Sequence, residues 1–223
     1  MKLRLIAAFT LGAGFLSAAE APERLQAAAD AFKEVMGIPD KSIPQDLLER
    51  AQCIVIVPGL KKGAFFIGAK YGKGFVSCRR AGGKGWSAPG SIRVEGGSIG
   101  FQWGGTETDA FMLVMNTKGM DRLLSTKFTL GGDASVAAGP VGRSTQAETD
   151  GALTAEILTW SRQRGLFVGL SLSGATLRED SDWNQDLYSK KISNRDIIMK
   201  GAVEAPQSAS ELMSELNRYS SRK

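Results

Sequence analysis

Hydrophobic residues recur at helical spacing near the start of the chain. Within residues 22–36 they lie three or four positions apart and form one face of a helix: Leu25, Ala28, Ala29, Phe32, Val35 and Met36. This pattern predicts an amphipathic helix whose apolar face packs on a core. Binding at a membrane surface is the alternative, but the polar face lacks the excess of cations that such helices favour. A second, shorter helix is expected over 44–51, capped near Ser42 or Ile43.

From Cys53 onward, the pattern changes to short runs of β-branched and aromatic residues separated by glycine. The runs are CIVIV, GAFFIGAKYG, GFVSCR, GWSAPGSIRVEGGSIGFQWGG and DAFMLVMN. Such runs predict strands joined by turns. The connections are too short for the crossover helices that parallel neighbours need, so we expect mostly antiparallel pairing.

The second half of the chain is predicted to mix helices and strands. Residues 118–127 indicate a short helix, and residues 165–177 alternate like a strand. Residues 148–160 fit a strand or a helix; Gly151 and Thr154 weaken the helix, but the periodicity does not decide. Helical pieces or turns are expected later, over 182–191, 193–201 and 208–221.

Together, these elements predict one α+β domain. Its sheet is largely antiparallel, or a partly closed barrel, and runs from Cys53 to about Asn116 and again near 165–177, with helices flanking it at both ends. A length of 223 residues fits a single domain. The 27 glycines exceed the average usage of about 7% and indicate many tight turns or close backbone contacts.

The first residues have the composition of a secretory signal peptide. Two cations precede an apolar run, and Ser17 and Ala19 occupy the −3 and −1 positions of a cleavage site. An uncleaved anchor is the alternative, but the run is shorter than the roughly 20 residues of a spanning helix. We therefore expect residues 1–19 to be removed, leaving a single domain at 20–223. This domain would be exported to the periplasm or to the membrane-associated cell envelope.

Cys53 and Cys78 are the two cysteines of the chain, and both fall in the part predicted to be exported. An oxidising compartment favours a disulfide between them, worth about 3 to 4 kcal/mol in the chain-entropy model. Two buried thiols are the alternative, because free cysteine packs as a small hydrophobe. The spacing matches no C-x-x-C motif or paired zinc site, so we expect no metal.

The chain contains no histidine, which excludes most familiar catalytic sites. Ser-His-Asp and Cys-His triads, H-E-x-x-H zinc sites and imidazole acid–base catalysis all need that side chain. Residues 96–100 match the nucleophile-elbow pattern G-x-S-x-G, but Ser98 has no histidine base to take its proton. An acid pair such as Glu148 and Asp150 could act in acid–base catalysis, although carboxylates are more often solvated surface groups.

Other ligand motifs are absent or incomplete. The chain has no phosphate-binding G-x-x-x-x-G-K-[ST] loop. A calcium-loop pattern begins at Asp180 but has Gln185 in place of the glycine and Lys191 in place of the final glutamate. The basic doublets are scattered and form no nucleic-acid recognition motif, so we expect no nucleic-acid partner.

Four segments in this order resemble the SYLF domain family, and the resemblance runs from about Ala31 to about Lys200. They are AQCIVIVPGLKKGAFFIGAKYGKGFV, WSAPGSIRVEGGSIGFQWGGTETDAFMLVMN, KFTLGGDASVAAGPVGR and SRQRGLFVGLSLSGATL. This family is a lipid-binding module whose yeast members also bind actin filaments and whose other eukaryotic members carry Src-homology or FYVE domains. A glycine cluster alone would be a weak signal, but four ordered motifs are specific.

The resemblance implies a non-enzymatic module that binds anionic phospholipid, with phosphoinositide-like head groups, at the cell envelope. It implies no catalytic residue and no cofactor. Actin is not an expected partner, because an exported chain would meet none. The alternative is a structural or scaffolding protein that contacts an envelope protein. An enzyme with an unfamiliar carboxylate site is a third hypothesis, which would need a deep pocket with paired acids.

The expected lipid-binding residues fall in two groups. Cations cluster around the first turns of the predicted sheet, and each would contribute about 1 kcal/mol near an anionic surface: Lys61, Lys62, Lys70, Lys73, Arg79 and Arg80. Exposed aromatic residues such as Phe65, Phe66 or Trp86 would dock beside them, although at least some of these aromatics are expected in the core. Ordinary solvated side chains are the alternative explanation for each cation.

The second group lies in the small-residue segment 129–144. Successive N–H groups in a glycine-rich turn can form a concave anion site. Asp133 would hold this loop through hydrogen bonds to backbone N–H groups, and the pocket itself would be formed by Gly131, Gly132, Gly139, Gly142 and Arg143. Close packing of this segment under the sheet is the alternative.

Overall fold

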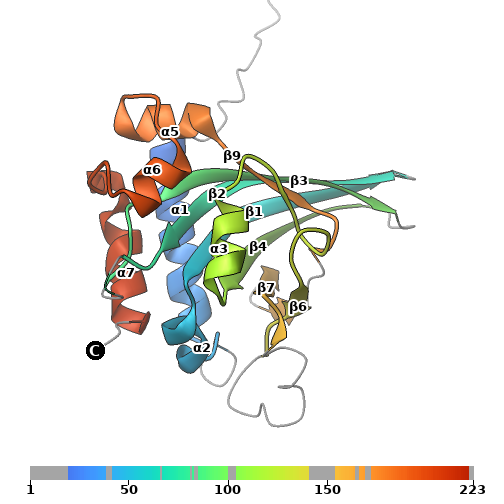
Figure 1. Cartoon of the computed structure of the whole chain (residues 1–223). Coiled ribbons are helices and arrows are strands. Elements are labelled where there is room, and N and C mark those ends of the chain that lie inside the picture. Colours follow the sequence, from blue (N-terminus) through green and yellow to red (C-terminus); the bar gives the residue numbers. More distant parts are fainter. Residues whose placement is uncertain are drawn as a thin grey trace, which may run out of the picture.

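A curled, mostly antiparallel sheet forms the centre of the molecule (Figure 1). The computed structural model describes residues 20–38, 42–65, 67–80, 82, 85–99, 104–140, 154–163, 166–168 and 172–220. The strands are β1 Cys53–Phe65, β2 Ile67–Cys78, β3 Gly90–Ile99, β4 Gly104–Val114, β5 Phe128–Thr129, β6 Val136–Ala138, β7 Ile157–Gln163, β8 Leu166–Val168 and β9 Thr176–Glu179. Their order is β5-β9-β3-β2-β1-β4-β7-β6, with β8 also paired to β7.

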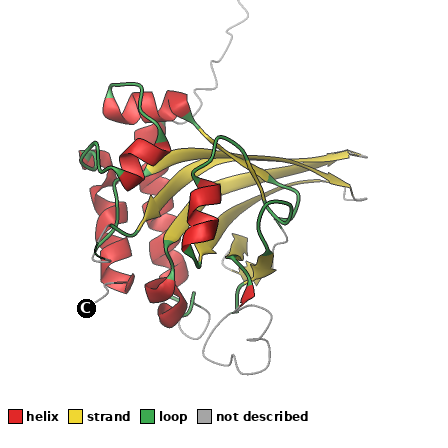
Figure 2. Cartoon of the chain, viewed as in Figure 1, coloured by secondary structure: helices red, strands yellow, loops and turns green. Residues whose placement is uncertain are grey.

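The helices lie on both faces of this sheet near one end of β1 to β4, and the far halves of these strands project past them (Figures 1 and 2). They are α1 Ala21–Met36, α2 Gln45–Arg50, α3 Thr117–Leu123, α5 Ser181–Tyr188, α6 Asn194–Met199, the short 3₁₀ helix Gln207–Ala209 and α7 Ser210–Ser220. Helices α1 and α7 pack against each other, with Phe32 and Tyr219 in an edge-to-face contact. The predicted α+β class, with a largely antiparallel sheet between N- and C-terminal helices, is confirmed.

Hydrophobic residues are buried on both faces of the sheet. Because successive side chains of a strand point to opposite faces, Ile54 and Ile56 of β1 pack with α1, α2 and α7, on what we call the helix face. Val55 and Val57 point to the opposite face. There they pack with residues from the segments that follow α3, β8 and α5, including Leu130, Leu172 and Ile197.

The predicted disulfide between Cys53 and Cys78 is confirmed. These residues are direct cross-strand partners on β1 and β2, and both are fully buried. The alternative of two free thiols is therefore excluded. The link joins the two central strands at the end of the sheet that the helices cover.

Several predicted boundaries differ from the structure. Pro44, rather than Ser42 or Ile43, occupies the N-cap position of α2, and the Ile43 side chain is fully buried in the core. Residues 157–160 form a strand, and the strand expected over 165–177 is instead two. The chain turns at Gly174, whose φ of +79° favours glycine, before β9 begins.

Candidate anion-binding site on the projecting strands

A β-bulge in β1 decides which side chains face which side of the projecting strands. The register shifts by one residue against β4 between Val57 and Leu60, and against β2 between Ile56 and Lys61. Gly59 lies within this bulge, with a φ of +60° that glycine tolerates. Leu60 therefore returns to the face of Val57, and Lys62 shares that face. Lys61 points to the helix face.

Lys62 and Lys70 are direct cross-strand partners on β1 and β2. Both are partly buried, and this burial lowers the pKa of each ammonium group. The positive charge of Lys70 lowers the pKa of Lys62 further. Their cross-strand partners on the neighbouring strands β4 and β3 are Thr106 and Gly96. Like charges placed directly opposite each other destabilise a sheet, and the charge of Lys70 acts on Lys62 in this sense.

The cations on the helix face have carboxylate neighbours. The ammonium group of Lys73 lies 2.8 Å from an oxygen of Asp180 and 4.5 Å from the centre of the Trp183 ring. Lys61 is exposed and pairs across the strands with Glu107 of β4. Lys61 and Lys62, adjacent in the sequence, therefore belong to two surfaces of different charge.

Arg79 and Arg80 also divide between two environments. Arg79 is only 8% exposed, and its guanidinium group donates to the backbone carbonyls of Leu48, Ala51 and Ser220. It connects α2 and α7 to the sheet. Arg80 is exposed, and its Nε donates to the carbonyl of Trp86.

Trp86, one of the candidate aromatics, lies in the core and not at the surface. Its side chain is 1% exposed, and its indole N–H donates to the hydroxyl of Ser220 at 2.9 Å. The ring fills the core beneath α7. The side chain of Phe65 and all of Phe66 lie outside the described residues.

The turn at Gly131 and Gly132 is closed by its own hydrogen bonds. The N–H of Gly131 donates to the carbonyl of Ala134 at 2.9 Å, and that of Gly132 donates to Thr129 at 3.3 Å. The Asp133 carboxylate accepts from the N–H of Thr129 at 2.6 Å, so its predicted role in holding the loop is confirmed. These N–H groups are engaged within the turn in this conformation.

Gly139 has a packing role. A Cβ added at this residue would lie 2.0 Å from ring atoms of Trp160, whose indole N–H donates to the carbonyl of Pro140. Only a residue without a side chain fits beneath this indole. Gly142 and Arg143, the remaining members of the predicted pocket, lie outside the described residues.

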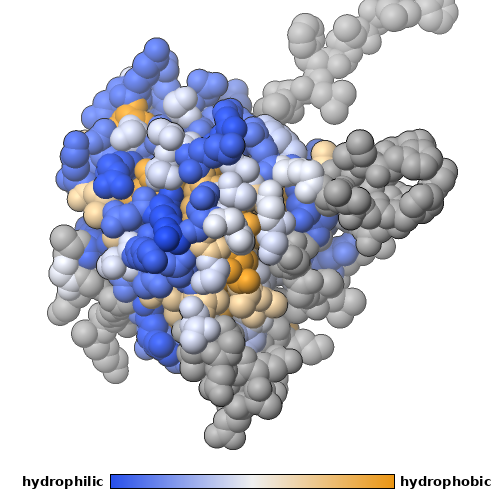
Figure 3. Space-filling model, turned by 45° about the vertical axis from the view of Figure 1, so that its right-hand side comes forward, coloured by the Kyte–Doolittle hydropathy of each residue, from blue (hydrophilic) through white to orange (hydrophobic). Residues whose placement is uncertain are grey.

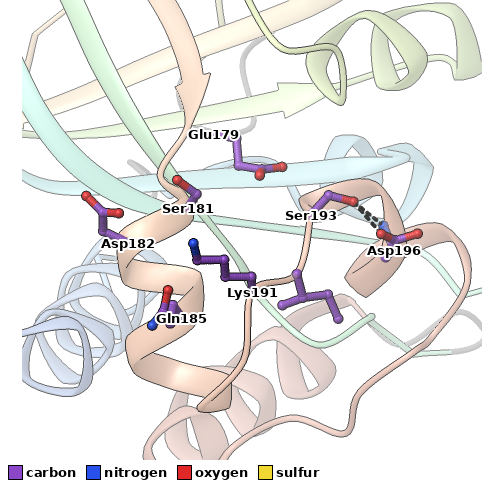
Figure 4. A pocket seen from close by; sticks show the side chains of 8 residues that line it. Glu179, Ser181, Asp182, Gln185, Lys191, Ser193 and Asp196 are labelled. Atoms are coloured by element: carbon purple, nitrogen blue, oxygen red, sulfur yellow. Dashed lines mark hydrogen bonds between the residues drawn. The ribbon is translucent and has the colours of Figure 1, made fainter.

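A polar pocket of about 410 Å³ lies between α5 and α6 (Figure 4). Three carboxylates line it, from Glu179, Asp182 and Asp196, together with the ammonium group of Lys191. The Glu179 carboxylate accepts from the N–H of Asn194, and the Ser193 hydroxyl donates to Asp196. This excess of carboxylates makes the pocket a poor site for an anion.

Hydrophilic side chains prevail on the face turned forward in Figure 3, with hydrophobic residues in a narrower band beside the grey atoms. Among the described residues, the large hydrophobic side chains with most exposure are Tyr71 and Met199. No helix in the described ranges is long and apolar enough to cross a membrane. Within the same ranges, no group of three Asp, Glu or Cys side chains is arranged to hold a metal ion.

Gly59 and Asp109, the residues that shape the bulge, were not predicted from the sequence. The Pro58-Gly59 pair inside an apolar strand was an available signal, because proline and glycine within strands often mark bulges. Asp109 and its partner Arg162 are far apart in the chain, and no short motif joins them.

Comparison with known proteins assigns the chain to a family. Residues 95–219 match the Ysc84 family model, described as "Las17-binding protein actin regulator". SH3 domain-containing YSC84-like protein 1 of Rattus norvegicus is 33% identical over 182 residues, which cover 81% of this chain and 53% of the relative. The corresponding protein of Homo sapiens is 32% identical, with 81% and 52% covered.

Protein YSC84 of Saccharomyces cerevisiae is 33% identical over 178 residues, which cover 78% of this chain and 37% of the yeast protein. The chain thus spans about half the length, or less, of these curated relatives. Identity at this level over most of the chain, together with the match over 95–219, is sufficient to assign a family. The chain belongs to the Ysc84 family, the SYLF domain family that its four ordered motifs resemble.

Proposed function

We propose that this chain is a non-enzymatic domain that binds anionic phospholipid head groups at the cell envelope. The observation that carries the proposal is the Lys62–Lys70 pair, two partly buried ammonium groups placed opposite each other on neighbouring strands. A phosphate group between them would replace repulsion with two charge-assisted hydrogen bonds. Head groups of the phosphoinositide type, implied by the family resemblance, carry such phosphates.

The position of the pair also supports membrane binding. Lys62 and Lys70 lie on strands that extend beyond the helices (Figure 1), where a surface can approach them. Each lysine near an anionic surface contributes about 1 kcal/mol. The proposal does not depend on Lys73 or Arg79, whose charges are engaged within the fold. Arg143 stays a candidate contributor.

The proposed location depends on the predicted signal peptide. Removal of residues 1–19 would release a mature domain at 20–223 into the envelope compartment, where the disulfide of this domain is chemically favoured. Mass spectrometry of the protein purified from envelope fractions would measure the mature N-terminus. A chain recovered from the cytoplasm with residues 1–19 intact would contradict this part of the proposal.

Sedimentation with lipid vesicles tests the proposed binding. We expect the 20–223 chain to sediment with vesicles of phosphatidylcholine mixed with phosphatidylglycerol, to do so less as salt rises, and not to sediment with phosphatidylcholine alone. Lys62→Glu with Lys70→Glu should abolish binding. Lys190→Glu with Lys191→Glu is the matched control, since these exposed lysines lie away from the projecting strands. Equal loss in both variants would indicate a general effect of net charge instead.

A second candidate function is protein binding. It is favoured by the description of the matched family, "Las17-binding protein actin regulator". In this case the chain would be a scaffold whose partner is an envelope protein. Crosslinking in intact envelopes followed by mass spectrometry would identify such a partner, and Lys62→Glu with Lys70→Glu would leave its capture unchanged.

A further inference from the structure

One peptide group in the bulge of β1 is held from both ends. The N–H of Gly59 donates to Oδ1 of Asp109 at 3.0 Å, and the carbonyl of Pro58, which belongs to the same peptide, accepts from Arg24 of α1 at 3.3 Å. Bulged residues lose their regular ladder partners. Two side chains replace those partners here, and together they set the orientation of the peptide.

The Asp109 carboxylate is itself held by a second cation. Its other oxygen, Oδ2, accepts from Nη2 and Nε of Arg162 at 2.8 and 3.2 Å. Arg162 also donates to Glu34 of α1, so helix α1, β4 and β7 meet at this carboxylate. The Asp109 side chain is 19% exposed, and burial raises its pKa, while the hydrogen bond from Gly59 acts in the opposite direction. The oxygen that faces Gly59 is thereby left with little freedom to move.

The bulge decides whether the two lysines meet. The bulge accommodates one extra residue at Gly59. The alternation of side chains after it therefore places Leu60 and then Lys62 on the face of Lys70. In a regular strand of the same sequence, alternation from Val57 would place Lys61 on that face and turn Lys62 toward the helices. The bulge also leaves no room for a side chain at residue 59, because a Cβ at Gly59 would lie 2.5 Å from a carboxylate oxygen of Glu107.

From this geometry we infer that Asp109 is a positioning residue for the Lys62–Lys70 pair, and that it acts through the Pro58–Gly59 peptide. The inference rests on the proposed function for its biological meaning. The placement of the lysines, however, is measurable without any lipid. Asp109 touches no ligand in this scheme; it holds the bulge that brings the two ammonium groups together.

A short amine-reactive crosslinker, difluorodinitrobenzene, reports the placement directly. In the 20–223 chain, peptide mapping by mass spectrometry should find a Lys62–Lys70 link. Asp109→Ala should lose most of this link, and Lys61 should take its place. Asp109→Asn should keep part of it, because the amide oxygen still accepts from the N–H of Gly59, although the NH2 group cannot accept from Arg162. A folded Asp109→Ala chain with an undiminished Lys62–Lys70 link would overturn the inference.

Deletion of Gly59 provides a rescue. Without the extra residue, regular alternation from Val57 again places Lys62 beside Lys70, so deletion combined with Asp109→Ala should restore the link and the fold. An Asp109→Ala chain that is unfolded and is not rescued by the deletion would assign Asp109 a general structural role and overturn the inference. Vesicle sedimentation is measured in parallel. If Asp109→Ala loses the Lys62–Lys70 crosslink but still binds anionic vesicles, the positioning role of Asp109 is supported. The proposal that the lysine pair binds lipid is then contradicted.

Discussion

The guanidinium group of Arg79 lies over the indole ring of Trp86, with its central carbon 3.9 Å from the ring centroid. The same group donates to three backbone carbonyls that end or follow α2 and α7. A cation in this position holds helices to a sheet. We therefore expect Arg79 to act in stability and not in lipid binding.

Arg79→Ala should lower the free energy of unfolding by about 2 to 4 kcal/mol, because buried carbonyls lose charge-assisted partners and the indole loses its cation. Urea titration followed by circular dichroism measures the change. Arg80→Ala is the neighbouring control and should stay within about 0.5 kcal/mol of the parent, since Arg80 is exposed. Similar losses in both variants would contradict this assignment.

Removal of the repulsion between Lys62 and Lys70 should stabilise the sheet. Lys62→Met is expected to raise the free energy of unfolding by about 0.2 to 1 kcal/mol in the absence of lipid, because a like-charged cross-strand pair is lost. The same variant should bind anionic vesicles less well. Lys61→Met is the control: it lies on the other face, opposite Glu107, and should bring no gain in stability. A destabilised Lys62→Met chain would show that the pair is not repulsive.

The lysine pair also predicts a pH dependence of stability. The pKa of Lys62 is lowered from its ordinary value of 10.5, first by burial and then by Lys70, and that of Lys70 is lowered by burial. Between the lowered pKa and 10.5 the unfolded chain binds more protons, so stability rises with pH across this alkaline window. Below the lowered pKa values both lysines are charged in the folded chain, so the destabilisation from their burial and mutual repulsion is fully present. Urea midpoints measured across the window should rise for the parent chain and rise less for Lys62→Met with Lys70→Met.

Gly139→Ala should destabilise the protein by about 1 to 3 kcal/mol, because the added methyl group would overlap the Trp160 ring. Thermal unfolding followed by near-ultraviolet circular dichroism would detect both the loss and the displaced indole. Gly132→Ala, in the same small-residue segment, is the control. Its added Cβ would find ordinary contacts at 3.5 Å or more, so stability should change little.

The sequence predicted those features that depend on local periodicity. The apolar face of residues 22–36 and the alternation that starts at Cys53 identified α1 and the central strands. The pairing of Cys53 with Cys78 was predicted differently, from the number of cysteines and from the predicted export of the chain. For α1 and the strands, neighbours within a few positions determine the outcome, so a pattern along the chain is enough.

The environments of the cations were not predictable in this way. Lys61 and Lys62 look equivalent in the sequence, yet as strand neighbours they face opposite sides of the sheet, and the bulge at Gly59 decides which side each one faces. Arg79 and Arg80 look equivalent too, but the carbonyls that bury Arg79 come from segments 28, 31 and 141 residues away. Long-range contacts decide the role of each cation, and no periodicity encodes them.

The packing of α1 against α7 has a consequence for modular architecture. Gln26 of α1 donates to Glu211 of α7 at 2.6 Å, so the first and last helices of the domain lie in one layer. A longer polypeptide carrying this fold would join it on the helix side at either terminus. Additional modules could then be attached there without obstructing the projecting strands, which would remain available at the far end of the molecule (Figure 1).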